Sequence, residues 1–238
     1  MAATGKGRTV ADQVYHQLRE DIFNGRLPAG SKLKLERLMA DYKVTMSPLR
    51  EALVRLCGDS LVTAEGYRGF WVAPISVDEL EDVCRVRALL EVEALNLALQ
   101  HGGAKWKAAV RKAYEALSAV ERSMSKDEDP PPEMIAEWER CNRAFHVALV
   151  SGCGSPWLIQ LNERLYRQTE RYRRLSLAGH RHHSVHDEHE AIFEAAMQSD
   201  AVRLFRLTRE HLERRTASEV RHALETMDAG EPAKDIAA

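Results

Sequence analysis

The 238-residue sequence predicts a mainly α-helical protein, in which three short helices and a β-hairpin are joined to an all-α helical bundle. Three observations support this fold class. Apolar residues recur at every third or fourth position through most of the chain, which is the period of an amphipathic helix. Two short apolar runs at 61–64 and 69–72 flank the turn sequence Glu-Gly-Tyr-Arg and predict the hairpin. Beyond residue 76 the sequence carries helical patterns and polar connectors, without a strand pattern.

The composition is that of a soluble globular protein, with 45% hydrophobic, 29% charged and 6% aromatic residues. The sequence lacks an apolar run long enough to span a membrane, and its first nine residues are too short and polar for a signal peptide. The four cysteines, at positions 57, 84, 141 and 153, lack a CxxC spacing and predict reduced thiols. We therefore expect a cytoplasmic protein that has no contact with a membrane.

Charge is distributed unevenly along a chain whose net charge is −2. Residues 1–75 hold eleven lysines and arginines against eight aspartates and glutamates, so the remainder of the chain is acidic. A mildly basic head on an acidic body is typical of a DNA-binding module attached to a part that does not bind DNA.

The first two helices are short. Val14, Leu18 and Ile22 repeat at intervals of four and predict a helix over residues 9–24. The turn sequence from Gly25 to residue 30 ends it, and the apolar pattern at 35–42 predicts the second helix.

The third helix begins near Thr45. Its apolar face is formed by Leu49, Ala52, Leu53 and Leu56. We expect Ser47 to be its N-cap and Pro48 its first helical residue. The hydroxyls of Thr45 and Ser47 gather with Arg50 at the helix start, an arrangement that suits insertion into a DNA major groove. An ordinary packed helix would have the same apolar pattern, but the neighbouring helix and the hairpin favour a winged helix-turn-helix over residues 1–75.

The remainder, residues 76–227, is predicted to be an all-helical domain for effector binding and dimerisation. Its helical segments are 78–101, 105–124, 134–151, 156–177, 185–198 and 201–227. The final stretch, 228–238, is predicted to be disordered.

Several polar side chains of this domain lie on apolar helix faces, where a polar residue is informative. They are Asn142 and His146 on one helix, His189 on a second and His211 on a third. A single inward histidine is more often a hydrogen-bonded core residue than a ligand. Three from separate helices indicate a metal site instead. The histidines at 180, 182, 183 and 186 lie in a polar connector and are expected to be solvated.

Arg87 is a second buried polar residue, because it shares a helix face with Val83, Leu90 and Ala94. A buried guanidinium needs an anion. Glu91, one turn further along, is the structural choice, and a ligand carboxylate is the functional one, since the planar fork of arginine suits it. Arg171 and Arg173 are further candidates for effector binding.

Two parts of the sequence resemble known families. The segments GRLPAGSKL, LMADYKVTMSPLREAL and LVTAEGYRGFWV resemble the N-terminal domain of GntR-type bacterial transcription regulators. That resemblance implies operator contacts from the recognition helix and the wing, here Thr45, Met46, Ser47, Pro48, Arg50, Arg68 and Gly69. Met46 and Glu36 stand where most members carry arginine. Because arginine bound to guanine is the commonest base-specific contact, we expect an operator that differs from the usual one.

The helical part resembles the FCD domain of the FadR subfamily. There an Asp-x3-His and two later histidines hold a divalent metal, often zinc or nickel, which implies Asn142, His146, His189 and His211 as ligands. Asn142 replaces the aspartate, so lower metal affinity is expected. An arginine at the place of Arg87 contacts effectors in that subfamily. The segments at 137–138, 144–146, 150–155 and 170–173 resemble the carbon-starvation-induced repressors of this subfamily. That resemblance implies glutarate or 2-hydroxyglutarate as effector.

These features predict a one-component transcription regulator, in our interpretation a repressor. It would bind double-stranded palindromic operator DNA as a homodimer and release it when a small organic acid binds. The first alternative is a metalloenzyme that uses the three histidines, although Glu188 and Glu190 are expected to point off the face of His189 and provide no general base. A DNA-packing protein without an effector is the other alternative, and the inward polar residues argue against it.

Overall fold

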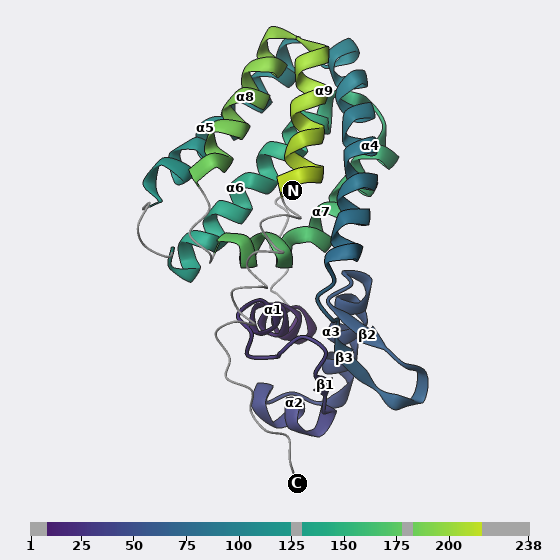
Figure 1. Ribbon diagram of the computed structural model, residues 1–238. Coiled ribbons are helices and arrows are strands. Elements are labelled where there is room, and N and C mark those ends of the chain that lie inside the picture. Colours follow the sequence, from purple (N-terminus) through teal and green to yellow (C-terminus); the bar gives the residue numbers. More distant parts are fainter. Residues whose placement is uncertain (1–8, 125–129, 178–182, 216–238) are drawn as a thin grey trace, which may run out of the picture. The chain divides into compact units, whose positions relative to one another are not determined.

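The computed structural model describes residues 9–124, 130–177 and 183–215, and the chain divides into two compact units at Ser76 and Val77 (Figure 1). The predicted mainly α-helical fold is confirmed. The predicted disordered tail at 228–238 and the part of the last predicted helix beyond residue 215 lie outside the described residues. Among the helices described, none combines the length and the apolar character needed to cross a membrane.

The N-terminal unit contains three helices and a small antiparallel sheet. In chain order these are α1 (Val10–Phe23), β1 (Lys32–Leu33), α2 (Leu35–Tyr42), α3 (Met46–Gly58), β2 (Val62–Ala64), the 3-10 turn η1 (Gly66–Arg68) and β3 (Phe70–Val72). The sheet order is β1-β3-β2, with Thr63 and Lys32 both paired to Trp71. The sequence did not predict β1, because two residues are too few to show an alternating pattern.

The start of α3 differs from the prediction. The helix begins at Met46 and Thr45 is its N-cap residue, so Ser47 is not the N-cap and Pro48 is the third helical residue. A proline is tolerated there because the first N–H groups of a helix have no intrahelical acceptor. The earlier start adds Met46 and Ser47 to the first turn of the helix.

The described elements of the C-terminal unit are all helical. Its elements are α4 (Val77–His101), α5 (Gly103–Ser123), α6 (Pro132–Val150), the 3-10 turn η2 (Ser151–Cys153), α7 (Pro156–Leu177), α8 (His183–Gln198), α9 (Ala201–Glu210) and the π-helical turn η3 (His211–Arg215). These bounds agree with the predicted segments to within a few residues up to α8. The helical pattern of 201–227 did not reveal the change to π-helical geometry at His211.

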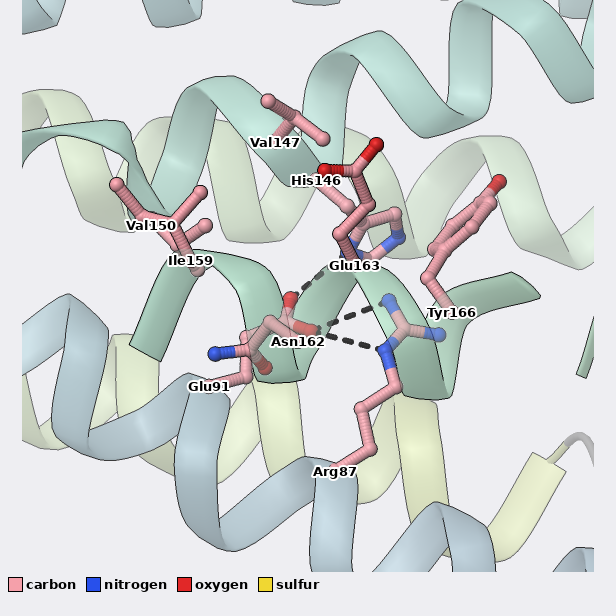
Figure 2. Close-up of a pocket in the computed structure, with 9 residues that line it drawn as sticks. All are labelled: Arg87, Glu91, His146, Val147, Val150, Ile159, Asn162, Glu163 and Tyr166. Carbon is pink, nitrogen blue, oxygen red and sulfur yellow. Dashed lines mark hydrogen bonds and ion pairs between the residues drawn. The ribbon is translucent and has the colours of Figure 1, made fainter. Parts of the chain in front are cut away.

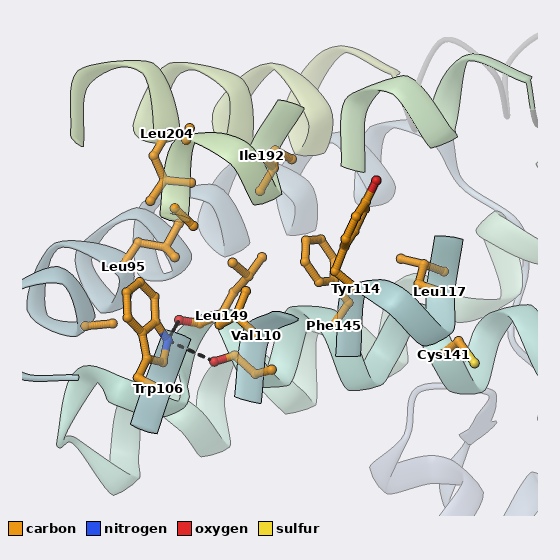
Figure 3. Close-up of a cluster of buried hydrophobic side chains, with 14 of the residues drawn as sticks. Leu95, Trp106, Val110, Tyr114, Leu117, Cys141, Phe145, Leu149, Ile192 and Leu204 are labelled. Atoms are coloured by element: carbon orange, nitrogen blue, oxygen red, sulfur yellow. Dashed lines mark hydrogen bonds between the residues drawn. The ribbon is translucent and has the colours of Figure 1, made fainter. Parts of the chain in front are cut away.

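The core of this unit fixes α5 against the end of α6 (Figure 3). Trp106 donates its indole N–H to the carbonyl oxygens of Ala148 and Leu149, at 3.1 and 3.0 Å. A Cβ on Gly102 would lie 2.7 Å from atoms of Trp106, so only glycine allows this approach. The contact determines the position of α6, the helix that carries Asn142 and His146.

Candidate functional site

The exposed face of α3 carries the residues predicted to bind DNA. Leu49, Ala52, Leu53 and Leu56 are fully buried beneath it and hold the helix on the core of the unit. Thr45, Ser47 and Arg50 are exposed, while Met46 and Pro48 are half-buried. The structure therefore leaves hydroxyl and guanidinium groups accessible on the first turn, the part of a recognition helix that reaches base edges.

The hairpin presents a second accessible cation. Gly69 closes the turn with φ of 113°, in the region that favours glycine. The preceding side chain, Arg68, is 82% exposed. Nearby on the sheet, the Lys32 ammonium lies 5.0 Å from the centroid of the Trp71 ring. The wing thus presents Lys32 and Arg68 as accessible positive charges.

Polar contacts between α1 and α3 hold the recognition helix in place. Arg55 donates to Asp12 at 2.5 Å and lies 4.3 Å over the ring of Tyr15, whose hydroxyl donates to Asp59 at 2.6 Å. The hydrogen bond from Arg55 lowers the pKa of Asp12 to about 2. Burial, together with Asp59, raises the pKa of Tyr15 to about 12. Asp12 is therefore ionised and Tyr15 neutral at neutral pH, so neither group titrates there.

In the helical unit, three histidines meet. His146 comes from α6, His189 from α8 and His211 from the first residue of η3, and their ligand nitrogens lie within 4.8 Å of one another. His146 and His189 are buried and His211 is half-buried. The structure thus brings together three of the residues predicted to bind metal.

Each of these histidines is oriented by a carboxylate. The Nδ1 atoms of His146, His189 and His211 lie 2.8, 2.7 and 2.8 Å from Glu91, Glu121 and Glu188 respectively. Such a contact fixes the tautomer with the proton on Nδ1 and leaves the Nε2 lone pair for a metal. His189 Nε2 is buried and has no hydrogen-bond partner among the described residues, as expected for a ligand nitrogen.

The protonation states suit metal binding. Burial lowers the pKa of His146 to about 3, and it lowers the pKa of His211 as well, so both rings are neutral near pH 7. Burial opposes ionisation of Glu91, but Arg87 and His146 overcome it and lower its pKa to about 2. Neutral imidazole is the form that coordinates metals.

A divalent cation fits this cluster by charge and by donor type. Glu91, Glu121 and Glu188 place three negative charges around the histidines, and Arg87 supplies one positive charge. A dication would neutralise the set, and three imidazole nitrogens suit zinc or a neighbouring transition metal. The residues present therefore fit a metal, although an asparagine stands where an aspartate would supply charge.

Asn142 is held in one orientation. Its Nδ2 donates to the Tyr166 hydroxyl at 2.9 Å. Its Oδ1 is buried and lacks a hydrogen-bond partner in the described part of the chain. A buried amide oxygen without a partner is costly. The contact with Tyr166 therefore leaves an oxygen available as a neutral ligand one turn from His146.

A pocket adjoins the cluster and contains the second predicted residue, Arg87 (Figure 2). It has an empty volume of about 250 Å³ that includes its mouth, while the enclosed part has room for about one water molecule. Its lining comes from α4, α6 and α7: Arg87, Glu91, His146, Val147, Val150, Ile159, Asn162, Glu163 and Tyr166. The pocket therefore shares Glu91 and His146 with the histidine cluster.

Arg87 is only 3% exposed and is paired within the protein. Its Nε donates to Glu91 Oε2 at 3.1 Å, and its guanidinium lies 4.8 Å from the centroid of the Tyr166 ring. Its Nη2 is also 3.1 Å from Glu91 Oε2 but, within the described residues, makes no hydrogen bond of good geometry. Figure 2 shows Glu91 between Arg87 and His146 and bonded to both. Glu91 is thus the partner of Arg87, as the structural alternative predicted, and the Nη2 group of Arg87 remains available to donate a hydrogen bond.

The other two predicted effector residues lie elsewhere. Arg173 forms a buried ion pair with Glu139 and lies 3.8 Å over the Tyr166 ring. Arg171 is buried and interacts electrostatically with Tyr172 and Glu79. Both are outside the set of described residues that line the pocket, so any contact with an effector would require rearrangement.

Two expectations about the polar residues are wrong. His186 was expected to be solvated, but it is half-buried and its Nδ1 lies 3.0 Å from Glu121. Glu188 was expected to point away from the site, but it contacts His211. The histidines at 180 and 182 lie outside the described residues.

The role of Glu121 as the carboxylate that orients His189 was not predicted from the sequence. This residue continues the buried stripe of Val110, Tyr114 and Leu117 on α5, so its position on an apolar face was a usable signal.

Comparisons with known proteins agree with this architecture. Residues 10–72 match the bacterial regulatory proteins of the gntR family, and residues 82–214 match the FCD domain. The chain is 40% identical over 207 residues to the HTH-type transcriptional regulator BphR of Paraburkholderia xenovorans (strain LB400), covering 87% of this chain and 83% of that protein. It is 36% identical over 203 residues to the HTH-type transcriptional repressor GlaR of Escherichia coli (strain K12), covering 83% and 90%.

Among solved structures, E. coli McbR/YncC has the same fold, with a TM-score of 0.67, 19% identity and coverage of 90% of this chain and 98% of that one. A winged helix-turn-helix unit followed by a helical unit is the architecture of a class of bacterial one-component transcription regulators. Within that class, the chain belongs to the GntR family and carries an FCD domain. Its relatives are named as regulators, so the comparisons give the metalloenzyme alternative no support.

Proposed function

We propose that the protein is a repressor that binds a palindromic operator as a homodimer and releases it when a small carboxylate enters the helical unit. The observation that carries the proposal is Arg87, a buried guanidinium that lines a pocket beside the histidine cluster. The name of GlaR, a transcriptional repressor similar over most of this chain, supports the sign of regulation. A cytoplasmic location, where operator DNA is accessible, follows from this function.

We assign operator binding to the first turn of α3 and to the wing. The contact residues are Thr45, Met46, Ser47, Pro48, Arg50, Arg68 and Gly69. Arg50 and Arg68 supply charge for phosphates or base edges, and the hydroxyls of Thr45 and Ser47 supply hydrogen bonds. Because Met46 cannot bind guanine as arginine does, apolar contact with a thymine methyl group becomes the natural role for it.

We assign a divalent metal, zinc or nickel, to His146, His189, His211 and the Asn142 oxygen. When bound, the metal would supply a positive centre for an anionic ligand beside the pocket. The protein's own contribution is orientation: Glu91, Glu121 and Glu188 fix the histidine rings, and Tyr166 fixes the amide of Asn142.

The effector would bind Arg87 with a carboxylate, and glutarate or 2-hydroxyglutarate is the specific hypothesis. The enclosed space holds about one water molecule, so an acid enters only if side chains move. Glu163, which lines the pocket and is half-buried, pairs with Arg143 and with Arg167 and is the accessible side chain to displace. An acid that binds the opened pocket better than the closed one can shift DNA affinity by roughly 1–3 kcal/mol.

The experiment is a thermal-shift and operator-binding titration of the full chain with glutarate and 2-hydroxyglutarate. An acid at about 100 times its dissociation constant stabilises the protein by roughly 2.7 kcal/mol, which is readily measured. We expect this shift, and the release of operator DNA, to be lost in Arg87→Ala. The matched control is Arg85→Ala, which removes an exposed arginine from the same helix. An unchanged response in Arg87→Ala would refute the assigned role of Arg87.

A further inference from the structure

The pocket contains one buried donor, which lies 3.1 Å from Glu91 but makes no hydrogen bond of good geometry, and one buried acceptor without a hydrogen-bond partner among the described residues. The donor is Nη2 of Arg87, and the acceptor is Oδ1 of Asn162. Asn162 is 5% exposed and lines the same pocket from α7 (Figure 2). Buried polar atoms in this state are rare and call for an explanation. A ligand that satisfies both atoms is the most direct one.

The orientation of the Asn162 amide is determined by its neighbour. Its Nδ2 donates to the carbonyl oxygen of Leu158 at 2.9 Å, one turn earlier on α7. Only the NH2 group of an amide can donate to a carbonyl, so the opposite atom is necessarily the oxygen. Asn162 therefore offers the pocket an acceptor, and its partner must be a donor.

We infer that the effector is a 2-hydroxy acid, and that Asn162 is the residue that selects the hydroxyl. This inference rests on the proposed function, in which Arg87 binds a carboxylate. A hydroxyl beside that carboxylate donates to Asn162 Oδ1 and so completes the second unsatisfied group. A plain acid of the same length satisfies Arg87 but leaves the buried amide oxygen without a donor, which weakens binding.

The charges around the pocket favour a hydroxyl over an ammonium group. The two carboxylates that line it are already paired, Glu91 with Arg87 and His146, and Glu163 with Arg143 and Arg167. A buried ammonium needs an anion, whereas a hydroxyl needs only one acceptor. A 2-amino acid is therefore expected to bind more weakly than the matching 2-hydroxy acid.

The test is isothermal titration of the full-length protein with glutarate, both enantiomers of 2-hydroxyglutarate, and glutamate, which differ only at carbon 2. We expect one 2-hydroxyglutarate enantiomer to bind about ten to a hundred times more tightly than glutarate. Succinate and malate repeat the comparison on a shorter chain. In Asn162→Leu the affinity for glutarate should be retained and the preference for the hydroxy acid lost. The control Gln160→Leu removes an exposed amide from the same helix and should keep the preference.

The outcomes separate this inference from the proposed function. Glutarate binding that equals or exceeds 2-hydroxyglutarate binding, yet depends on Arg87, overturns the inference and leaves the proposed function standing. Tightest binding of glutamate also overturns it. A preference that survives in Asn162→Leu assigns the hydroxyl to another group, such as the metal. Absence of binding by every acid removes the proposed effector and the inference together. The wild-type comparison decides the ligand class even if Asn162→Leu fails to fold.

Discussion

Glu91 shows how much chemistry one buried carboxylate can organise. One of its oxygens accepts from Arg87 and the other contacts His146, so it orients both the predicted effector residue and a predicted metal ligand. Sequence reasoning identified Glu91 as a partner for Arg87 from their spacing of four residues on one helix. Its contact with His146 joins α4 to α6 across 55 positions of sequence, and no local pattern encodes such a pairing.

The other orienting carboxylate, Glu121, allows a direct test at the residue scale. It is buried and accepts from Trp138, His186 and His189. We expect Glu121→Gln to reduce metal affinity about ten- to a hundredfold, because an amide orients His189 poorly and removes negative charge.

The measurement is competition with a chromogenic chelator, using zinc and nickel in turn. Glu115→Gln, an exposed substitution on the same helix, is the control and should leave metal affinity unchanged. Equal affinities in the wild type and Glu121→Gln would assign Glu121 to the packing of α5 alone.

At the scale of elements, the residues of α3 that are predicted to bind DNA and those that stabilise the fold lie on different sides of the helix. Arg50 is exposed on the first turn, whereas Arg55 contacts Asp12 and Tyr15 of α1. We expect Arg50→Ala to weaken operator binding by roughly 1–3 kcal/mol with an unchanged melting temperature. Arg55→Ala should lower the melting temperature by a few degrees, since it removes the contact with Tyr15.

Fluorescence anisotropy on labelled operator and thermal denaturation of the same samples make the comparison. A melting temperature that falls in Arg50→Ala as much as in Arg55→Ala would show that both arginines are structural. The salt dependence of binding should also become less steep in Arg50→Ala if its contact is a phosphate.

The helices were predictable from the sequence because their apolar patterns repeat over several turns. The spans of α2 and α7 agree with the predicted ranges, and the other helices up to α8 differ by one to three residues where caps are ambiguous. Thr45 is the N-cap residue in place of Ser47, although its side chain makes no capping hydrogen bond, and the local pattern of two nearby hydroxyl residues did not distinguish the two positions. The π-helical turn at His211 was not predictable, because the stripe of Leu204 and Leu207 continues with an ordinary helical period.

The meeting of the three histidines was predictable from the sequence, whereas their surroundings were not. Inward histidines are visible in sequence because a polar residue interrupts an apolar stripe. The unsatisfied oxygen of Asn162 was not, since its state depends on the backbone carbonyl of Leu158 and on the packing of three helices. Contacts between distant segments require the tertiary structure.

At the scale of the whole molecule, exposed apolar side chains suggest how two chains would associate. Val86 and Leu89 are exposed on α4, and Trp157 and Leu161 on α7, and these two helices pack against each other. Trp157 is 73% exposed, which is unusual for the largest apolar side chain. We propose this surface for the homodimer, because a tryptophan near the centre of an interface often dominates binding.

Trp157→Glu is expected to convert the proposed dimer into a monomer at micromolar concentration, as measured by light scattering. Val202→Glu, at a position 81% exposed on α9, introduces the same charge elsewhere and should leave the dimer intact. A dimer that persists in Trp157→Glu would place the interface on a different surface. A half-site of a palindromic operator is bound by one head alone. The monomer should therefore bind a half-site no more weakly than the wild type does.

The shared carboxylate of Glu91 has a consequence for the cell that carries this regulator. In the proposed function, an acid that draws Arg87 away from Glu91 would change the carboxylate that supports His146, and acid binding and metal binding would be thermodynamically linked. Linkage is reciprocal: whatever factor the metal contributes to acid affinity, the acid contributes to metal affinity. In the proposed function, the acid concentration needed to release the operator would then rise or fall with the free metal concentration. When the free metal concentration is low, the same concentration of acid would release a different fraction of the operator DNA.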